Sequence, residues 1–479
     1  MVDRTCPLLL TLSMRETRSD KTKLLSESRL RAWFGGLIKS RRWGGFSANI
    51  LKNTAYLGAA RIAQLAVGFT VGVSVARYLG PADSGALAYA ISFSALFSSA
   101  AALGLDTIVV RDLAAAQDQT DAATEEILSA AFMLRLLASP ATLLLIAAAS
   151  MIANQDAHTR LLVLIVASSV LFQPITIIDL YFQSRVQSKY VVYAQITALI
   201  VVSLTRIILI GLKAPLTGFA IVTVAETALS MLGLAYLYKR HRGHLPRPNA
   251  NKLIVYRLLR EAWPLALTGV LTSIYINVDR VLIKQLLGNA SAGKYAVVVS
   301  ISSALYFVPV AFGQSIFPSL VEARSDAALY HRRLQQAFDT LLWAAIALAL
   351  PIALFSEPLM QRLYGAAYSG SGSALAILIW SAVVTFLGLV TSYWLVAENL
   401  QRLYPIRIFA SLCTSVALNL MLIPRWGIRG AAVATVSAQF VSSTIVYAFS
   451  SRTRLMVTMQ LRALALPFRL WTAWTNEKE

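Results

Sequence analysis

The feature that most constrains this chain is the recurrence of apolar stretches about as long as a membrane is thick. A helix needs roughly 20 consecutive apolar residues to cross about 30 Å of hydrocarbon. Such stretches follow one another after residue 50, and 57% of the residues are hydrophobic while only 14% are charged. A water-soluble fold of this length cannot bury so much apolar surface, which excludes a soluble enzyme. We predict an all-α polytopic membrane protein with about 12 transmembrane helices. The expected spans are 54–77, 86–106, 127–152, 161–183, 190–211, 216–238, 262–287, 294–318, 337–356, 373–396, 405–423 and 430–450.

The distribution of basic residues predicts the topology. The chain has 43 Lys and Arg against 23 Asp and Glu, a formal net charge of +20. In a soluble protein this balance would suggest nucleic acid as a partner, but in a membrane protein it is typical of cytoplasmic loops. Most of the basic residues lie in the two tails and in alternate loops. The positive-inside rule therefore places both termini in the cytoplasm, and no nucleic acid partner is expected.

The same charge pattern divides the chain into five parts. The heaviest basic cluster between spans lies at 239–261, which we interpret as a cytoplasmic linker between two groups of six spans. Residues 1–50 are expected to form a basic cytoplasmic tail, since their short apolar run does not make a signal peptide. The basic, Leu- and Trp-containing tail at 451–479 could lie in the membrane surface or be unstructured. The remaining parts, 51–238 and 262–450, are the two predicted six-helix bundles.

An internal repeat relates the two predicted bundles. The positions that match lie 208 residues apart and include two glycines, each at a short outer turn where a tight reversal is needed. Because six spans separate the copies, both halves have the same orientation in the membrane, as in transporters built from parallel repeats. Two equivalent bundles imply a central cleft. The matched residues are Leu79, Gly80, Gly85, Ala88, Ser92 and Ser94 with Leu287, Gly288, Gly293, Ala296, Ser300 and Ser302.

Basic and amide side chains inside the spans are candidates for binding an anionic substrate. An ionisable group in hydrocarbon is costly, so such groups usually face a cavity or a partner. At 100° per residue, one polar stripe forms on the first span and another on the seventh. The alternative for each arginine or lysine alone is snorkelling to a headgroup or a fixed ion pair. The candidates for a cationic cavity are Arg61, Gln64, Arg135, Arg206, Asn277, Arg280 and Lys284.

Four acidic residues in or at the ends of spans are candidates for coupling transport to an ion gradient: Asp179, Glu226, Asp279 and Glu398. A carboxylate in a dehydrated setting can carry H⁺ or bind Na⁺. Asp279 could equally serve only to neutralise a nearby basic group. No cofactor is expected, and no metal site, because the two cysteines, Cys6 and Cys413, form no CxxC pattern.

Several motifs, in order along the chain, resemble the polysaccharide-export branch of the multidrug/oligosaccharidyl-lipid/polysaccharide flippase superfamily, the Wzx-like proteins. The resemblance runs from about residue 50 to 450 and includes short motifs in both halves. They are Asn53-Thr54, Ala76 to Pro81 with Gly85, Leu103 to Asp106 with Arg111, Asn277 to Arg280, Leu287-Gly288 with Gly293 and Tyr295, Phe317-Pro318, Tyr364-Gly365 with Tyr368, Leu418 to Leu420, Ile423-Pro424, Trp426-Gly427 and Gly430 to Ala432.

This resemblance implies a two-bundle, alternating-access flippase of the bacterial cytoplasmic (inner) membrane. Its substrate would be an undecaprenyl-pyrophosphate-linked oligosaccharide, used to make O-antigen, capsule or exopolysaccharide. A cationic central cavity, the lipid bilayer, and a polysaccharide polymerase and chain-length regulator as partners are further implications of the family.

Three other functions stay open. A cation-coupled multidrug antiporter of the same superfamily should favour an acidic cavity, whereas the balance inside these spans is basic. A flippase for a lipid-linked peptidoglycan precursor is compatible with the composition. A polysaccharide polymerase or ligase would need polar groups converging in a sizeable outer loop, and the outer loops here look short. We therefore expect a transporter rather than an enzyme.

Overall fold

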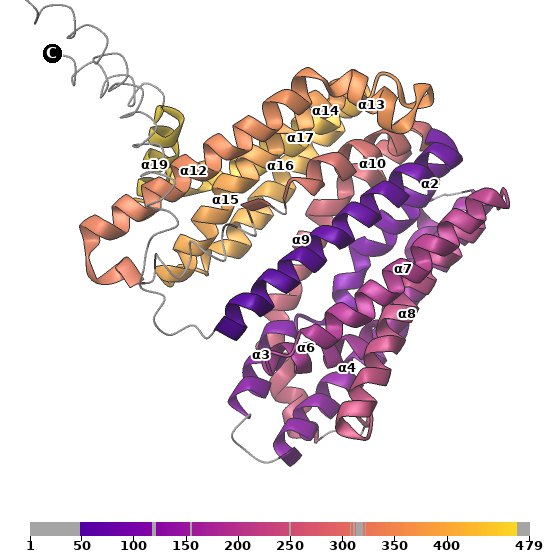
Figure 1. Cartoon of the computed structure of the whole chain (residues 1–479), viewed down its shortest axis with the longest axis vertical. Helices are drawn as coiled ribbons and strands as arrows, with labels where there is room; N and C mark the ends of the chain where they lie inside the picture. Colours follow the sequence, from indigo (N-terminus) through magenta and orange to yellow (C-terminus); the bar gives the residue numbers. More distant parts are fainter. Residues whose placement is uncertain are drawn as a thin grey trace, which may run out of the picture. The chain divides into compact units, whose positions relative to one another are not determined.

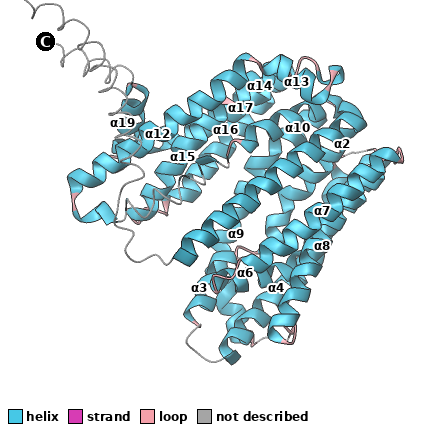
Figure 2. Cartoon of the chain, viewed as in Figure 1, coloured by secondary structure: helices cyan, strands magenta, loops and turns pink. Residues whose placement is uncertain are grey.

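The computed structural model describes residues 48–116, 121–153, 156–248, 251–306, 308–309, 312, 320 and 322–466, with side chains from Gln64 onward. Residues 60–479 form one compact unit, and the account below concerns that unit. The predicted tail at 1–50 lies outside the described residues except for its last three, as does the end of the C-terminal tail. Across the described ranges the secondary structure is helical, with no strand (Figure 2).

The helices of the first half are drawn in indigo to magenta (Figure 1). They are α2 (Ala48–Ala102), α3 (Asp106–Ala115), α4 (Asp121–Ile152), α5 (Ala157–Ala167), the 3₁₀ helix η1 (Ser168–Ile175), α6 (Thr176–Ser184), α7 (Lys189–Gly211) and α8 (Leu216–Arg242). The second half comprises α9 (Lys252–Leu287), α10 (Asn289–Ala304), η2 (Ala323–Ser325), α12 (Ala327–Leu354), α13 (Ser356–Tyr364), η3 (Ala366–Tyr368), α14 (Gly372–Leu378), α15 (Trp380–Ala397), α16 (Leu403–Trp426), α17 (Ile428–Phe440), the π-helix η4 (Val441–Ile445), α18 (Val446–Ala448) and α19 (Arg454–Leu464).

Ten helical segments in the part searched are long and apolar enough to cross a membrane. The first of them, Gln64–Ala115, has 52 residues and contains two of the predicted spans. Gly80 divides it, because a φ of 71° and a ψ of 177° break the helix there. The eighth predicted span, 294–318, begins within α10 and continues into residues that are only partly described. The all-α polytopic architecture is therefore confirmed.

The apolar surface of these helices faces outward as well as inward. Leu144 on α4 is 72% exposed and Ile208 on α7 is 59% exposed. In water such side chains would lose the stabilisation that burial gives, about 25 cal/mol per Å² of apolar surface. Lipid tails are as apolar as these side chains, so outward leucine and isoleucine are what a membrane-spanning bundle should show.

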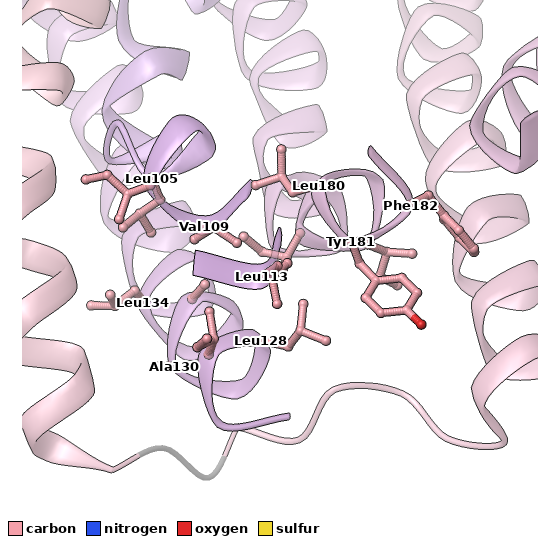
Figure 3. Packing of buried hydrophobic residues seen from close by; sticks show 14 of the residues in the cluster. Leu105, Val109, Leu113, Leu128, Ala130, Leu134, Leu180, Tyr181 and Phe182 are labelled. Atoms are coloured by element: carbon pink, nitrogen blue, oxygen red, sulfur yellow. The ribbon is translucent and has the colours of Figure 1, made fainter. Parts of the chain in front are cut away.

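Each half has hydrophobic clusters of its own. In the first half, one cluster joins α3, α4 and α6, with Leu113, Leu128 and Phe182 fully buried (Figure 3). In the second half, another joins α12, α15 and α19 through fully buried Phe338, Phe386 and Met456. The parallel internal repeat of two six-helix bundles is compatible with this separation but stays a prediction.

Helix α9 is the element that belongs to both halves. Near its start, Leu258 and Ala262 lie in the cluster that joins α3, α4 and α6. Near its end, Ile283 lies in a cluster with α10, α14 and α17. The linker predicted at 239–261 is accordingly mostly helical, because α8 continues to Arg242 and α9 begins at Lys252.

The described part of the C-terminal segment forms helix α19, which packs against α12, where the indole Nε1 of Trp343 donates to the Ala463 carbonyl at 3.0 Å. Gln460 is buried and donates to the Ser443 carbonyl at 3.0 Å and to the Thr391 hydroxyl at 3.2 Å. The opposite face of α19 exposes Leu461 and Leu464, so a position at the membrane surface stays a prediction.

Candidate functional site

Asp279 on α9 is the centre of a polar cluster inside the second half. Its side chain is buried, and three other helices supply hydrogen-bond donors to its two oxygens. From α16, the Asn419 amide donates to Oδ1 at 2.6 Å and the Ser415 hydroxyl at 3.1 Å. From α17 the Thr435 hydroxyl donates to Oδ2, and from α10 the Tyr295 hydroxyl does so at 3.4 Å. Four neutral donors can hold a buried carboxylate without a salt bridge.

Small residues allow these helices to approach Asp279 closely. Gly427 takes a φ of 59° and reverses the chain between α16 and α17. Gly430 then packs on α16, since a Cβ there would lie 2.3 Å from the Leu422 carbonyl oxygen. Ala431 and Ala434, both fully buried, continue this close packing to Thr435. The glycine and alanine pattern after Trp426 thus brings the Thr435 hydroxyl to the carboxylate.

The cluster offers oxygen atoms to a small cation. Asn419 Oδ1 is buried and has no hydrogen-bond partner within the described part of the chain. The oxygens of Ser415 and Asp279 lie at the nitrogen of the same amide, and the Thr435 hydroxyl lies at the other carboxylate oxygen. Na⁺, like other hard cations, is held by oxygen ligands, and a carboxylate with hydroxyl neighbours can also hold a proton. The geometry supports either ion at Asp279.

The other three predicted acids lie apart from Asp279 and from one another. Glu226 on α8 pairs with Arg206 on α7 at 2.9 Å. Glu398, which follows α15, accepts from the Tyr330 hydroxyl at 3.0 Å and lines a cavity of about 340 Å³ with Arg324 and His331 on the side of the linker. Asp179 on α6 lies near Asp106, the ion-pair partner of Arg135. Ion coupling through these three residues stays a prediction that the geometry does not favour.

The predicted cationic residues do not converge in one cavity in this conformation. Arg135 on α4 is 1% exposed and pairs with Asp106 at 2.6 Å. It also donates to the Ala102 carbonyl at 3.2 Å and to the Thr176 hydroxyl. Gln64 on α2 is half-buried, and the side chain of Arg61 lies outside the described residues.

The polar stripe of α9 lies against the second half of α2. The Ser273 hydroxyl donates to the Ala95 carbonyl, and the Arg280 guanidinium donates to the Ser92 hydroxyl at 3.3 Å. One turn further, the Lys284 ammonium lies 4.7 Å from the centre of the Tyr89 ring. Asn277 is buried and donates to the Ser273 carbonyl of its own helix at 2.9 Å. The stripe thus forms a contact between the two halves, in which Arg280 and Lys284 touch the neutral side chains of Ser92 and Tyr89.

The glycines of the proposed repeat have the same geometry in both halves. Gly80 has φ 71° and ψ 177°, and Gly288 has φ 82° and ψ 177°. Gly85 and Gly293 pack against each other, because a Cβ on Gly85 would lie 1.8 Å from the Asn289 carbonyl oxygen. A Cβ on Gly293 would lie 2.0 Å from the corresponding carbonyl oxygen of Pro81. On the predicted outer side, the two halves therefore touch backbone to backbone.

Sequence reasoning identified Asp279 but not the residues that bind it. The missed residues are Tyr295, Ser415, Asn419 and Thr435, all neutral and all on other helices. One signal could have found part of the set. Polar residues recur at every fourth position of α16, at 407, 411, 415 and 419, which places them on one face of an otherwise apolar helix.

Comparisons with known proteins agree with this fold. A model of the family described as "Polysaccharide biosynthesis protein" matches residues 50–324, more than half of the chain. A curated protein of Haloferax volcanii, "Probable flippase AglR", is 24% identical over 226 residues. That match covers 46% of each protein, so the chain spans about half the length of the curated relative it matches.

Two solved structures show the same fold. An inward-facing multidrug resistance MATE family transporter of the MOP superfamily has a TM-score of 0.65 and 16% identity, over 86% of this chain and 99% of that one. The lipid II flippase MurJ, in an inward closed conformation, has a TM-score of 0.66 and 16% identity, over 87% and 93%. The fold is that of MOP-superfamily transporters.

Proposed function

The chain belongs to the polysaccharide biosynthesis protein family, and from this premise we propose that it is a flippase for a lipid-linked oligosaccharide. The family match over residues 50–324 is the observation that carries the proposal. Support also comes from the partial similarity to a probable flippase and from the fold, which is shared with a lipid II flippase. The substrate we propose is an undecaprenyl-pyrophosphate-linked oligosaccharide for O-antigen, capsule or exopolysaccharide. The chain would act in the bacterial inner membrane, with both termini in the cytoplasm.

In this proposal the protein performs no covalent chemistry. The two halves would separate on one side of the membrane and close on the other, while the polyprenyl tail stays in lipid. Arg280 and Lys284 line the contact between the halves, where they touch the Ser92 hydroxyl and the Tyr89 ring. When that contact opens, their charges become available to the pyrophosphate, to which arginine donates charge-assisted hydrogen bonds. Arg61, on α2, the helix that α9 contacts there, is a further candidate.

Asp279 would couple this movement to an ion gradient. It lies one residue before Arg280 on the same helix, so a change in its charge acts at the contact between the halves. Binding of H⁺ or Na⁺ neutralises the carboxylate and removes its attraction for the adjacent guanidinium. The ion and the anionic substrate thus act on neighbouring residues of one helix.

The test is deletion of the gene, followed by fractionation of polyprenyl-linked oligosaccharide. We expect completed units to accumulate on the cytoplasmic side while surface polysaccharide disappears. Wild type should restore the surface polysaccharide, whereas Asp279→Asn and Arg280→Ala should not, although both reach the membrane. Asp83→Asn, which removes an exposed carboxylate at the first outer turn, is the matched control and should restore it.

Three outcomes would contradict the proposal in different ways. Unchanged surface polysaccharide together with sensitivity to small cationic drugs would favour a multidrug antiporter. Accumulation of lipid II would favour a peptidoglycan precursor flippase. Lipid-linked units that reach the periplasmic side but are not extended would favour a polymerase or ligase.

A further inference from the structure

A row of polar side chains runs along one face of α16 from near its start to the Asp279 site. Arg407, Ser411, Ser415 and Asn419 follow one another at intervals of four residues. At about 1.5 Å per residue, the row extends about 18 Å along the helix axis. Ser411, Ser415 and Asn419 are each at most 1% exposed, so the row lies inside the bundle. Buried hydroxyls placed in a line are unusual in an apolar core, where each must be satisfied by a partner.

Helix α9 contributes the facing side of this row. Tyr275 lies one turn before Asp279 and beside Ser411, whose hydroxyl donates to the Ala438 carbonyl at 2.7 Å. The Tyr275 hydroxyl is buried and has no hydrogen-bond partner among the described residues. A tyrosine hydroxyl can both donate and accept, so it can bridge the gap between Ser411 and the carboxylate site.

Arg407 lies where the row meets the predicted cytoplasmic end of α16. Its guanidinium donates to the Ser392 hydroxyl at 2.9 Å and to the Tyr447 hydroxyl at 3.2 Å, and lies 4.5 Å from the centre of the Tyr404 ring. Its Nε is buried without a partner in the described structure. No ion pair joins Arg407 to an acidic residue within the described ranges, so its positive charge is not neutralised there.

The other side of Asp279 is apolar on the same two helices. One turn beyond Asp279 on α9 is Ile283, and one turn beyond Asn419 on α16 is Ile423, both fully buried. Ala431 and Ala432 of α17 and Ala292 of α10 complete this layer. An ion that reached Asp279 from the outer side would have to cross this dry layer without ligands, which is costly.

From this asymmetry we propose that the hydroxyls of Ser415, Ser411 and Tyr275 form a proton path that connects Asp279 to the cytoplasmic side, past Arg407, in this conformation. This inference rests on the proposed role of Asp279 as the coupling site, and it names the coupling ion as H⁺. A proton leaves the Asp279 carboxyl group for a neighbouring hydroxyl oxygen, and that hydroxyl passes its own proton onward to water at the cytoplasmic end. The carboxylate remains behind, and no other group changes its charge.

Arg407 and the burial of the row together favour H⁺ over Na⁺. The guanidinium repels any cation, but a metal ion would also have to shed its water and find room between buried side chains. A proton moves by exchange between hydroxyls and needs no room for an ion. The charged or titratable groups near the Asp279 carboxylate are Tyr275 and Arg280 of α9 and Tyr295 of α10. Helices α16 and α17 face it with neutral groups, those of Ser415, Asn419 and Thr435.

The test uses dicyclohexylcarbodiimide, a membrane-permeant reagent that modifies protonated carboxyl groups in apolar surroundings, on the full-length protein in membrane vesicles of known orientation. Labelling of Asp279 is located by peptide mass spectrometry. We expect labelling to fall as the pH on the cytoplasmic side rises and not to change with the pH on the other side. Added Na⁺ should not protect Asp279 in wild type.

Three variants test the path itself. Ser411→Ala and Tyr275→Phe should slow the response of labelling to a cytoplasmic pH step. Thr414→Val is the matched control, because it removes a hydroxyl from the same helix that bonds only the Ala410 carbonyl of its own turn, at 2.8 Å. Arg407→Gln removes the positive charge beside the row, so Na⁺ should reach Asp279 and slow its labelling by about tenfold. A tenfold effect corresponds to about 1.4 kcal/mol of repulsion between Na⁺ and the guanidinium.

Each contrary result overturns a defined part of the inference. Labelling that follows the outer pH, or that never occurs, rejects the path. Protection of the wild-type protein by Na⁺ rejects H⁺ as the ion. If labelling responds to the pH step as fast in Ser411→Ala and in Tyr275→Phe as in wild type, these two hydroxyls are not part of the path. If labelling follows the cytoplasmic pH while the deletion strain keeps its surface polysaccharide, the path stands and the proposed function falls.

Discussion

At the scale of single residues, Arg135 shows how a buried charge can serve packing instead of binding. It joins the end of α2, through the Ala102 carbonyl, to Asp106 at the start of α3 and to Thr176 of α6. Leu103 and Gly104, which lie between the first two, both have positive φ. A sharp turn of this kind leaves helix-end carbonyls without partners, and a guanidinium with five donors can satisfy several groups at once.

We predict that Arg135→Gln lowers the free energy of unfolding by about 2 kcal/mol, because it removes charge-assisted hydrogen bonds. The loss should be smaller than for a fully buried ion pair, since Asp106 is 58% exposed and water can replace the guanidinium. Thermal unfolding in detergent measures the effect. Unchanged thermal stability together with loss of flipping would instead assign Arg135 to the substrate.

At the scale of elements, α5 begins at a side-chain cap. Asp156 precedes α5, and its carboxylate accepts from the Thr159 backbone N–H at 2.9 Å. That hydrogen bond is the main reason that the pKa of Asp156 is lowered. The cap satisfies one of the N–H groups that a helix start leaves free, and the negative charge lies at the positive end of the helix dipole.

We predict that Asp156→Ala costs about 1 kcal/mol of stability at neutral pH, the usual value for such a cap. Because the pKa is lower in the folded state, the contribution of the cap is present above the unfolded pKa of about 3.9 and is lost as the pH falls through the folded value. Wild type and variant should therefore converge in acid. A constant difference between their unfolding temperatures below about pH 3 would contradict the role of the carboxylate.

At the scale of the whole molecule, Gly85 and Gly293 join the two halves at the predicted outer side. The two glycines bring α2 and α10 into backbone contact. Nearby, the Tyr368 hydroxyl donates to the Ala76 carbonyl at 2.8 Å, and Arg77 donates to the Arg362 carbonyl at 3.1 Å. In a protein that works by alternating access, all these contacts must break when the outer side opens.

We predict that Gly85→Leu opens the outer side, because its side chain cannot share space with the Asn289 carbonyl. A cysteine introduced at Ala76, in a chain lacking Cys6 and Cys413, should then react faster with a membrane-impermeant thiol reagent. Gly72→Leu is the matched control, since a Cβ at Gly72 meets nothing within 4 Å. Equal reactivity in the two variants would show that this contact does not close the outer side.

The amino-acid sequence determined the class of fold, the approximate positions of the spans and the family. These follow from local properties, because the length of an apolar stretch or a motif such as Leu287-Gly288 depends only on residues that are neighbours in the sequence. Asp279 was also identifiable, because a carboxylate in an apolar span is rare whatever surrounds it.

Tertiary structure alone decided which polar residues meet. Ser415, Asn419, Thr435 and Tyr295 look like ordinary helix residues, and they become one site only because α9, α10, α16 and α17 converge on Asp279. Likewise, the sequence left open whether Arg135 and Arg206 have fixed ion-pair partners, and these, Asp106 and Glu226, lie on other helices. The sequence shows that a charged group must be satisfied, whereas the partner that satisfies it depends on contacts between residues far apart in the chain.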